Sequence, residues 1–230
     1  MRLRALTWNL MHGRSQPPAG RDLLDEFSDA LARWEWDVAL LQEVPPWWPE
    51  AMAARLGGGA QHRSVLTSRN ELLSVRRALA VRSPDAIKSA GGGANAMLVR
   101  RADLRIADHR ALLLCRWPER RRLHAVRLVA AERELWVGNL HATVHDDPAA
   151  RREGEQARVA MGRWAAGAPF VLGGDFNVRG LALAGLATAA HHDVDYIFVA
   201  GLEAAGDAQV LDRGALSDHA PVAVTLDVSH

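Results

Sequence analysis

Apolar segments of strand length recur along the whole chain, and each is bounded by glycine, proline or charged residues. Their lengths and boundaries are typical of buried β-strands rather than of helices. Nine such segments cover residues 3–10, 38–44, 96–99, 111–115, 123–130, 135–140, 169–172, 196–199 and 221–226. The pattern therefore predicts a protein rich in β-structure.

Two other stretches have the spacing of amphipathic helices. The apolar face of the first is formed by Leu23, Leu24, Phe27, Leu31 and Trp34. The second begins at Asp147-Pro148, where aspartate caps a helix and proline fits the first turn, and it continues through Trp164. We find no internal repeat, linker or break in composition. The sequence predicts an α/β fold in one domain spanning residues 1–230.

Composition narrows the class of protein. Apolar residues make up 49% of the chain and charged residues 24%, which is typical of globular proteins. The single cysteine, Cys115, excludes an intramolecular disulfide and a multi-cysteine zinc site. A net charge of +1 gives no support to nucleic-acid or membrane binding. The beginning of the chain has no signal-peptide pattern, and no apolar run approaches the roughly 20 residues that cross a bilayer. We expect a cytoplasmic, monomeric protein with no transmembrane segment.

Polar residues stand where the apolar segments end. Those that end or follow a segment are Asn9, Glu43, His141, Asp175 and Asn177. Near the C-terminus the order reverses, and Asp195 and the pair Asp218-His219 precede a segment. If all these side chains line one rim, the last two strands run opposite to the earlier ones. The order therefore predicts mixed sheets.

Gathered at one rim, this set combines carboxylates, carboxamides and imidazoles. Carboxylate and amide oxygens are the ligands that Mg²⁺ and Mn²⁺ prefer, whereas the histidines are too far apart in sequence for a compact zinc motif. A divalent cation with few protein ligands keeps positions open for water and phosphate oxygens. The set therefore indicates hydrolysis of a phosphate ester.

Six short motifs, in this order, carry a resemblance to a known family. They are Thr7-Trp8-Asn9, Leu41-Gln42-Glu43-Val44, Asn139-Leu140-His141, Gly173-Gly174-Asp175-Phe176-Asn177, Asp195-Tyr196-Ile197 and Ser217-Asp218-His219-Ala220-Pro221. Together they resemble the signature of the endonuclease/exonuclease/phosphatase (DNase I-like) superfamily. That superfamily includes pancreatic-type DNases, abasic-site endonucleases, neutral sphingomyelinases and inositol-polyphosphate phosphatases. The resemblance implies a four-layer α/β sandwich, in which two packed mixed β-sheets are flanked by helices.

The resemblance also implies roles for individual residues. Glu43 would be the main ligand of Mg²⁺ (or Mn²⁺), with Asn9 beside it and Asp218 near the metal. Met11 stands where some nucleases of the superfamily place a further acidic ligand, and this departure puts a second metal in doubt.

The implied catalytic residues are Asp175, Asn177, Asp195, His219 and His141. Asp175 would orient or deprotonate the attacking water, and Asn177 would hold that water or a phosphate oxygen. His219, oriented by Asp195, would contact the scissile phosphate. His141 resembles the second histidine of the DNase-like and sphingomyelinase-like branches. The glutamate that pairs with that histidine in DNase-like enzymes has no counterpart here, because the neighbourhood is glycine-rich, at residues 91–93.

Substrate contacts are predicted in the middle of the chain. The segment at residues 93–100 resembles the superfamily's Gly-Asn-Ala-Ile-Leu-Ser-Arg strand, which suggests Asn95 at the rim of the site. Arg69 and Asn70 are further candidates. We interpret Arg120-Arg121-Arg122 as a solvated hairpin tip rather than a phosphate clamp, and Trp47-Trp48 as packing rather than a platform for stacking.

These inferences converge on a Mg²⁺- or Mn²⁺-dependent phosphohydrolase in which water attacks phosphorus in line with the leaving oxygen. The substrate is a phosphodiester or phosphomonoester, and His141 and His219 are both candidates to protonate the leaving group. A small or lipid-like substrate is favoured over DNA, because nucleic-acid affinity depends on neutralising phosphates and the net charge is near zero. A DNA endonuclease or exonuclease is the alternative within the family. A non-catalytic binding module on the same fold is the alternative outside it, although such a module predicts losses in the polar set that are not seen.

Overall fold

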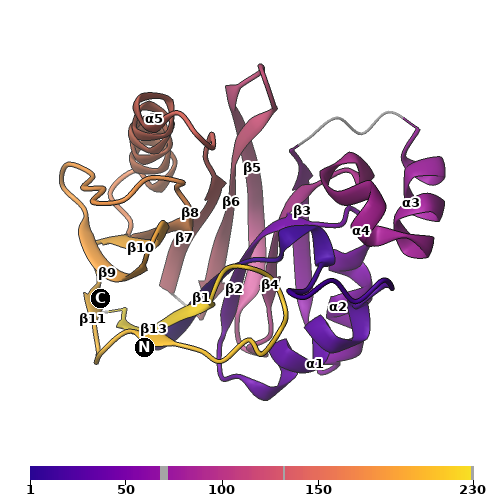
Figure 1. Cartoon of the computed structure of the whole chain (residues 1–230). Coiled ribbons are helices and arrows are strands. Elements are labelled where there is room, and N and C mark those ends of the chain that lie inside the picture. The colour runs from indigo at the N-terminus through magenta and orange to yellow at the C-terminus, as the bar shows by residue number, and fades with distance from the viewer. Residues whose placement is uncertain (68–71, 132, 229–230) are drawn as a thin grey trace.

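The computed structural model describes residues 1–67, 72–131 and 133–228, and its strands form two sheets (Figure 1). The first sheet has the order β11-β13-β1-β2-β4-β3, and β12 also pairs with β13. Its strands are β1 (Arg2–Asn9), β2 (Val38–Val44), β3 (Gln61–Leu66), β4 (Ala94–Val99), β11 (Glu203–Ala204), β12 (Gln209–Val210) and β13 (Val222–Asp227). The second sheet has the order β5-β6-β7-β8-β10-β9. Its strands are β5 (Arg105–Cys115), β6 (Arg121–Ala130), β7 (Arg133–His141), β8 (Phe170–Asp175), β9 (Ala187–His192) and β10 (Asp195–Ala200).

Helices lie on the outer faces of both sheets. The helices are α1 (Leu24–Arg33), α2 (Trp48–Leu56), α3 (Leu73–Arg82), α4 (Pro84–Ile87) and α5 (Asp147–Ala165), with two short 3₁₀ turns, η1 (Met11–Gly13) and η2 (Lys88–Gly91). In Figure 1, α5 covers the second sheet, whereas α1 and α2 lie on the opposite side of the molecule. Trp48 at the start of α2 is 1% exposed and packs on Phe27, so the packing interpretation holds for this tryptophan.

Three apolar cores separate the four layers. Leu40, Val137 and Ile197 belong to the core between the two sheets. Phe27 and Met52 belong to the core between the first sheet and its helices, and the third core lies between the second sheet and α5. Because side chains alternate along a strand, each sheet buries both of its faces. The predicted sandwich of two packed mixed sheets flanked by helices is confirmed.

The strand directions agree with the order of the polar residues. Strands β1 and β2 are parallel, as are β7 and β8. By contrast, β13 runs antiparallel to β1, and β10 runs antiparallel to β8. The two strands that follow their polar residues are therefore reversed, as predicted, and their first residues lie at the same end of the sandwich as the last residues of the others.

All nine apolar segments form strands, and both predicted helices are present. The cap of α5 is a small correction, because it is Asp146, not Asp147, whose side chain accepts a hydrogen bond from the backbone N–H of Ala149. Strands β3 and β9 and helices α2 to α4 were not predicted. No helix in the described ranges is long and apolar enough to cross a membrane.

Candidate active site

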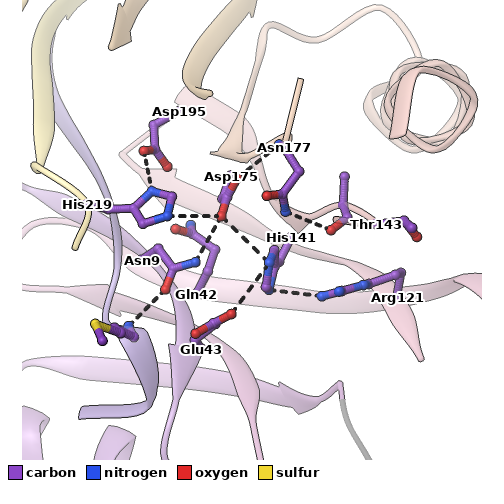
Figure 2. A network of polar contacts seen from close by, with 12 residues as sticks. Asn9, Gln42, Glu43, Arg121, His141, Thr143, Asp175, Asn177, Asp195 and His219 are labelled. Atoms are coloured by element: carbon purple, nitrogen blue, oxygen red, sulfur yellow. Dashed lines mark hydrogen bonds and ion pairs between the residues drawn. The ribbon is translucent and has the colours of Figure 1, made fainter. Parts of the chain in front are cut away.

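The sheet register brings the predicted residues of the second sheet into one row. His141 on β7 lies beside Asp175 on β8, and Asp175 lies beside Asp195 on β10. Each lies an even number of positions from a residue of the inter-sheet core on its own strand (Val137, Val171 and Ile197), so all three point into the space between the sheets. Asn9, at the end of β1, faces them from the first sheet, as Figure 2 shows.

The backbone around this row is strained. Among the described residues, Met11, His12, Glu43, Asn177 and Ser217 all have positive φ angles, between 49° and 62°. Such conformations cost non-glycine residues about 1–3 kcal/mol each, and they gather at functional sites. The strain therefore indicates a site whose side-chain directions matter.

Gly174 is required where the neighbouring strands β7 and β8 run below the site. Its φ is +139°, and a Cβ placed there would lie 1.9 Å from the carbonyl oxygen of Leu140. Only glycine allows β8 to approach β7 this closely just before Asp175.

His219 and Asp195 form the closest charged pair of the site. Nδ1 of His219 lies 2.7 Å from Oδ2 of Asp195. Burial alone would lower the pKa of His219, but the hydrogen bond and charge of Asp195, with smaller effects of Asp175 and Asp218, raise it to about 10. His219 is therefore an imidazolium at neutral pH. Its backbone is held from the first strand, because the indole N–H of Trp8 donates to the His219 carbonyl oxygen at 3.0 Å.

Asp175 is buried at the centre of the cluster (Figure 2). Its Oδ2 accepts from Asn9 Nδ2 at 2.9 Å, and its Oδ1 accepts from the backbone N–H of Asn177 at 2.9 Å. Burial and then the charge of Asp195 raise the pKa of Asp175 to about 7, although His219 and these two hydrogen bonds oppose the rise. A carboxyl group with a pKa near neutrality is suited to exchange protons at the pH of the cell. The Nδ2 of Asn177 donates to the carbonyl oxygen of Ala142 at 2.9 Å, which fixes the direction of this amide.

His141 contacts an arginine rather than a carboxylate through its Nδ1. Nη1 of Arg121 lies 3.1 Å from Nδ1 of His141. On its other side, Nε2 of His141 lies 3.6 Å from Asp175 Oδ2 and 3.8 Å from Glu43 Oε1. Burial and then the positive charge of Arg121 hold the pKa of His141 well below its usual range. His141 is therefore neutral, whereas His219 is charged.

Glu43 offers its carboxylate to the same space. Its Oε2 lies 3.2 Å from Nε2 of His12, whose Nδ1 contacts the carbonyl oxygen of Gly92 at 3.2 Å. No arginine or lysine pairs with Glu43 in the part of the chain that the structure describes. A carboxylate accepts about four hydrogen bonds or ligand contacts, so this one retains acceptor capacity.

The donor set fits a hard divalent cation. Glu43 and Asp175 each place a carboxylate oxygen within 4 Å of the Nε2 of His141. Asn9 donates to Asp175 through Nδ2, and its Oδ1 accepts from the backbone N–H of Met11 at 2.9 Å and keeps a second lone pair. Such oxygen ligands suit Mg²⁺ or Mn²⁺. Ligand atoms of Asp175, Asp195 and His219 also lie within 4.8 Å of one another. The imidazolium of His219 has no lone pair to offer, however, and its Nδ1 already binds Asp195, so this trio is suited to holding charge rather than metal.

Comparison with known proteins gives the family. The sequence profile of the Endonuclease/Exonuclease/phosphatase family matches residues 6–219. The chain belongs to this family. Among curated proteins, none matches the chain in sequence. Membership supports a hydrolase of the phosphoesterase type, and it confirms the resemblance carried by the six motifs.

Solved structures with the same fold share little sequence with this family member. An endonuclease/exonuclease/phosphatase from Bacteroides vulgatus is 16% identical, with 100% of both chains covered and a TM-score of 0.75. A TDP2 from D. rerio, humanized by 14 mutations, is 14% identical, with 98% of this chain and 99% of that chain covered and a TM-score of 0.70. A mannosyl-6-phosphatase from Bacteroides thetaiotaomicron is 17% identical, with 98% of this chain and 99% of that chain covered and a TM-score of 0.70. At these identities the likeness shows the fold alone.

The other predicted residues make no hydrogen bond or ion pair with the cluster among the described residues. Asp218 is exposed, and the only hydrogen bond of its side chain that the described residues show is with the Ser217 hydroxyl, at 3.5 Å. Asn95 is fully buried and donates to the carbonyl oxygen of Arg122 at 3.1 Å, so it bridges the two sheets rather than lining a rim. Arg69 and Asn70 lie outside the described residues.

Two residues of the site were missed from the sequence. His12 follows β1 by three positions, and its place after the Asn9 motif was the available signal. Arg121 was interpreted as part of a solvated hairpin tip, but its side chain is only 6% exposed and lies against His141. With Glu43, Ser89 and Arg120, these residues line a cleft of about 210 Å³ beside the cluster.

The motifs also contain residues that hold the site together. Nε2 of Gln42 on β2 donates to Oδ1 of Asn139 on β7 at 2.8 Å, and Nδ2 of Asn139 donates to the carbonyl oxygens of Leu41 and Ala96, both at 2.9 Å. All these groups are buried between the sheets. The link fixes the two sheets directly under the cluster, because buried polar groups are costly unless they are paired.

Proposed function

We propose that this protein is a divalent-metal-dependent phosphohydrolase that cleaves a phosphate ester by in-line attack of water. The observation that carries the proposal is the division of charge around Asp175. On one side lies the imidazolium of His219, and on the other lies the neutral His141 (Figure 2). Glu43 presents a carboxylate oxygen to the same space, and the amide nitrogen of Asn9 donates to Asp175. A group of this kind attracts a phosphate and also keeps one carboxyl group able to take a proton.

Asp175 is the residue we assign to water activation. Its pKa of about 7 lets it accept a proton from water when it is ionised, and hydrogen bonds from Asn9 and Asn177 fix its two oxygens. A base with a pKa near the working pH is the most effective, and such groups contribute about 10²–10⁴-fold to rate.

The residues around Asp175 are assigned to the charge that develops on the phosphoryl group. His219 supplies a fixed positive charge that Asp195 orients, and Asn177 supplies an amide near the same carboxylate. Groups that are aimed in advance at developing charge are often the largest contribution to catalysis. Glu43 and Asn9, with Asp218 as a further candidate, are the proposed ligands of Mg²⁺ (or Mn²⁺). When bound, that cation would neutralise negative charge on phosphoryl oxygens.

The proposed substrate is small or lipid-like rather than DNA. The net charge of +1 gives little of the phosphate neutralisation that duplex binding requires. The cleft beside the cluster, at about 210 Å³, suits a compact group. One fold neighbour is named for a mannosyl phosphate, and we propose small phosphate esters of this kind as the first to test. The cytoplasmic location and the monomeric state of the protein stay predictions.

A substrate panel tests the proposal. Release of phosphate or of the leaving group is measured for sugar phosphates, inositol phosphates, phospholipids, dinucleotides and supercoiled plasmid, each with Mg²⁺, with Mn²⁺ and with EDTA. We expect turnover of at least one small or lipid-like ester, dependent on the metal and lost in Asp175→Ala. Efficient nicking of plasmid at physiological salt would overturn the substrate ranking. No turnover of any ester by folded protein with metal would overturn the function.

A further inference from the structure

A buried arginine lies behind one of the two site histidines. Arg121 begins β6, and its side chain is only 6% exposed. Its Nη2 pairs with Glu119 Oε2 at 2.9 Å. Its Nη1 lies 3.1 Å from Nδ1 of His141, as Figure 2 shows. A cation buried to this degree against a site residue is expected to act on that residue.

The contact determines which nitrogen of His141 carries the proton. A guanidinium has five N–H donors and no acceptor. Nδ1 of His141 must therefore accept, and the ring proton lies on Nε2. That nitrogen faces Asp175 Oδ2 at 3.6 Å and Glu43 Oε1 at 3.8 Å. The N–H thus points into the space where the proposed function places the phosphate.

We propose that Arg121 is a positioning residue that fixes His141 as the Nε2–H tautomer, so that His141 donates a hydrogen bond to a phosphoryl oxygen and does not protonate the leaving group. The phosphate in this statement rests on the proposed function, whereas the tautomer does not. A carboxylate on Nδ1, which His141 lacks among the described residues, would have the opposite effect, because it accepts from an Nδ1–H and supports an imidazolium. An arginine at this position therefore favours the neutral, Nε2-protonated ring.

The inference has a consequence for the reaction. When the P–O bond breaks, its electron pair stays on the leaving oxygen, and the proton for that oxygen comes from a donor other than His141. Loss of His141 should then slow esters with good and poor leaving groups by the same factor, about 10²-fold for one lost hydrogen-bond donor. A general acid behaves differently, because its loss slows poor leaving groups much more than good ones.

The tautomer is tested without any activity. Long-range ¹H–¹⁵N spectra of the metal-free protein report the protonation of each ring nitrogen, and loss of a signal in His141→Gln assigns it. We expect Nδ1 unprotonated and Nε2 protonated between pH 6 and 8. Folded Arg121→Met should show the Nδ1–H tautomer of His141 as well, whereas Arg127→Met is the matched control. Arg127 lies on the same strand but pairs with the exposed Glu134, so its loss should leave the spectrum unchanged. An Nδ1–H in the wild type, or an unchanged His141 spectrum in Arg121→Met, would overturn the proposal.

The role in the reaction is tested with aryl phosphodiesters of increasing leaving-group pKa. We expect His141→Ala to lower kcat by one factor across the series, with Arg121→Met acting in the same direction and Arg127→Met at wild-type rates. A loss that grows with leaving-group pKa would make His141 the general acid and would contradict the proposal. If the wild type hydrolyses none of the series, the proposed function is in question, and the spectra still decide the tautomer. If Arg121→Met does not fold, the wild-type spectrum and the His141→Ala series test the proposal without it.

Discussion

Replacing Asp195 with asparagine separates the charge of this residue from its shape. The amide oxygen of asparagine can still accept from Nδ1 of His219, so the ring should keep its orientation. The negative charge, which now lies 2.7 Å from that nitrogen, is lost. Because burial alone lowers the pKa of His219, removal of its main charged partner should return that pKa to its ordinary value or below.

The size of the effect follows from the structure. The pKa of His219 is raised from an ordinary 6.5 to about 10. At 1.36 kcal/mol per pKa unit, this corresponds to about 5 kcal/mol in favour of the charged imidazolium, most of it due to Asp195. In Asp195→Asn the alkaline limb of the pH–rate profile should therefore move from near pH 10 toward neutrality. At pH 8 turnover should fall by about two to four orders of magnitude, since the imidazolium is then largely absent.

The assay is kcat against pH with a chromogenic phosphodiester and saturating Mg²⁺, and circular dichroism checks the fold. Asp193→Asn is the matched control, because Asp193 lies two residues away and pairs with the exposed Arg179. That variant should keep the wild-type rate and profile. If Asp195→Asn leaves both the rate and the alkaline limb in place, Asp195 and His219 do not act as a pair and the assignment is wrong.

Two further predictions concern the free energy of unfolding of the metal-free protein, measured in the presence of a chelator. The pKa of Asp175 is raised from 3.8 to about 7, so the contribution of this group to the free energy of unfolding is present below pH 3.8 and lost as pH rises to 7. In Asp175→Asn, urea titrations should show a free energy of unfolding that no longer falls for this reason between pH 3.8 and 7. Wild-type and mutant curves of stability against pH that run parallel would contradict the prediction. His124 is fully buried, neither ring nitrogen has a hydrogen-bond partner among the described residues, and burial lowers its pKa to about 3. The free energy of unfolding of the wild type should therefore fall as pH drops from 6.5 to 3. At pH 5 the His124→Phe variant should be more stable than the wild type by about 2 kcal/mol. Equal free energies of unfolding at pH 5 would contradict this prediction.

The strands and the row of polar residues were predictable because both are local signals. An apolar segment with a polar residue at its end marks a strand and a rim position at once, as at Asn9 and Asp175. The reversed order at Asp195 and His219 gave the strand directions. By contrast, β3 was not predicted, since all six of its residues are at least partly exposed, and α3 has no buried residue among those described.

The partners of the predicted residues could not be found in the same way. Arg121 is one of three consecutive arginines, and only the pairing of β6 with β7 places its side chain beside His141 rather than in solvent. Similarly, the bond between Gln42 and Asn139 depends on which faces of the two sheets meet. Asn95 belongs to the same class, because its burial between the sheets follows from packing and not from its motif.

The central claim is that the protein hydrolyses a phosphate ester with a divalent metal held by Glu43. It is tested most directly by the metal requirement of the wild type and of a Glu43 variant. Hydrolysis of bis(p-nitrophenyl) phosphate is measured after EDTA treatment and during titration with Mg²⁺ or Mn²⁺, in the wild type and in Glu43→Gln. The side chain of Glu43 is 24% exposed and contacts the imidazoles of His12 and His141, so the substitution should leave the fold intact. We predict no hydrolysis without metal, recovery on titration, and a metal requirement at least tenfold higher in Glu43→Gln. Full activity of metal-free protein, or an unchanged metal requirement in Glu43→Gln, would contradict the account.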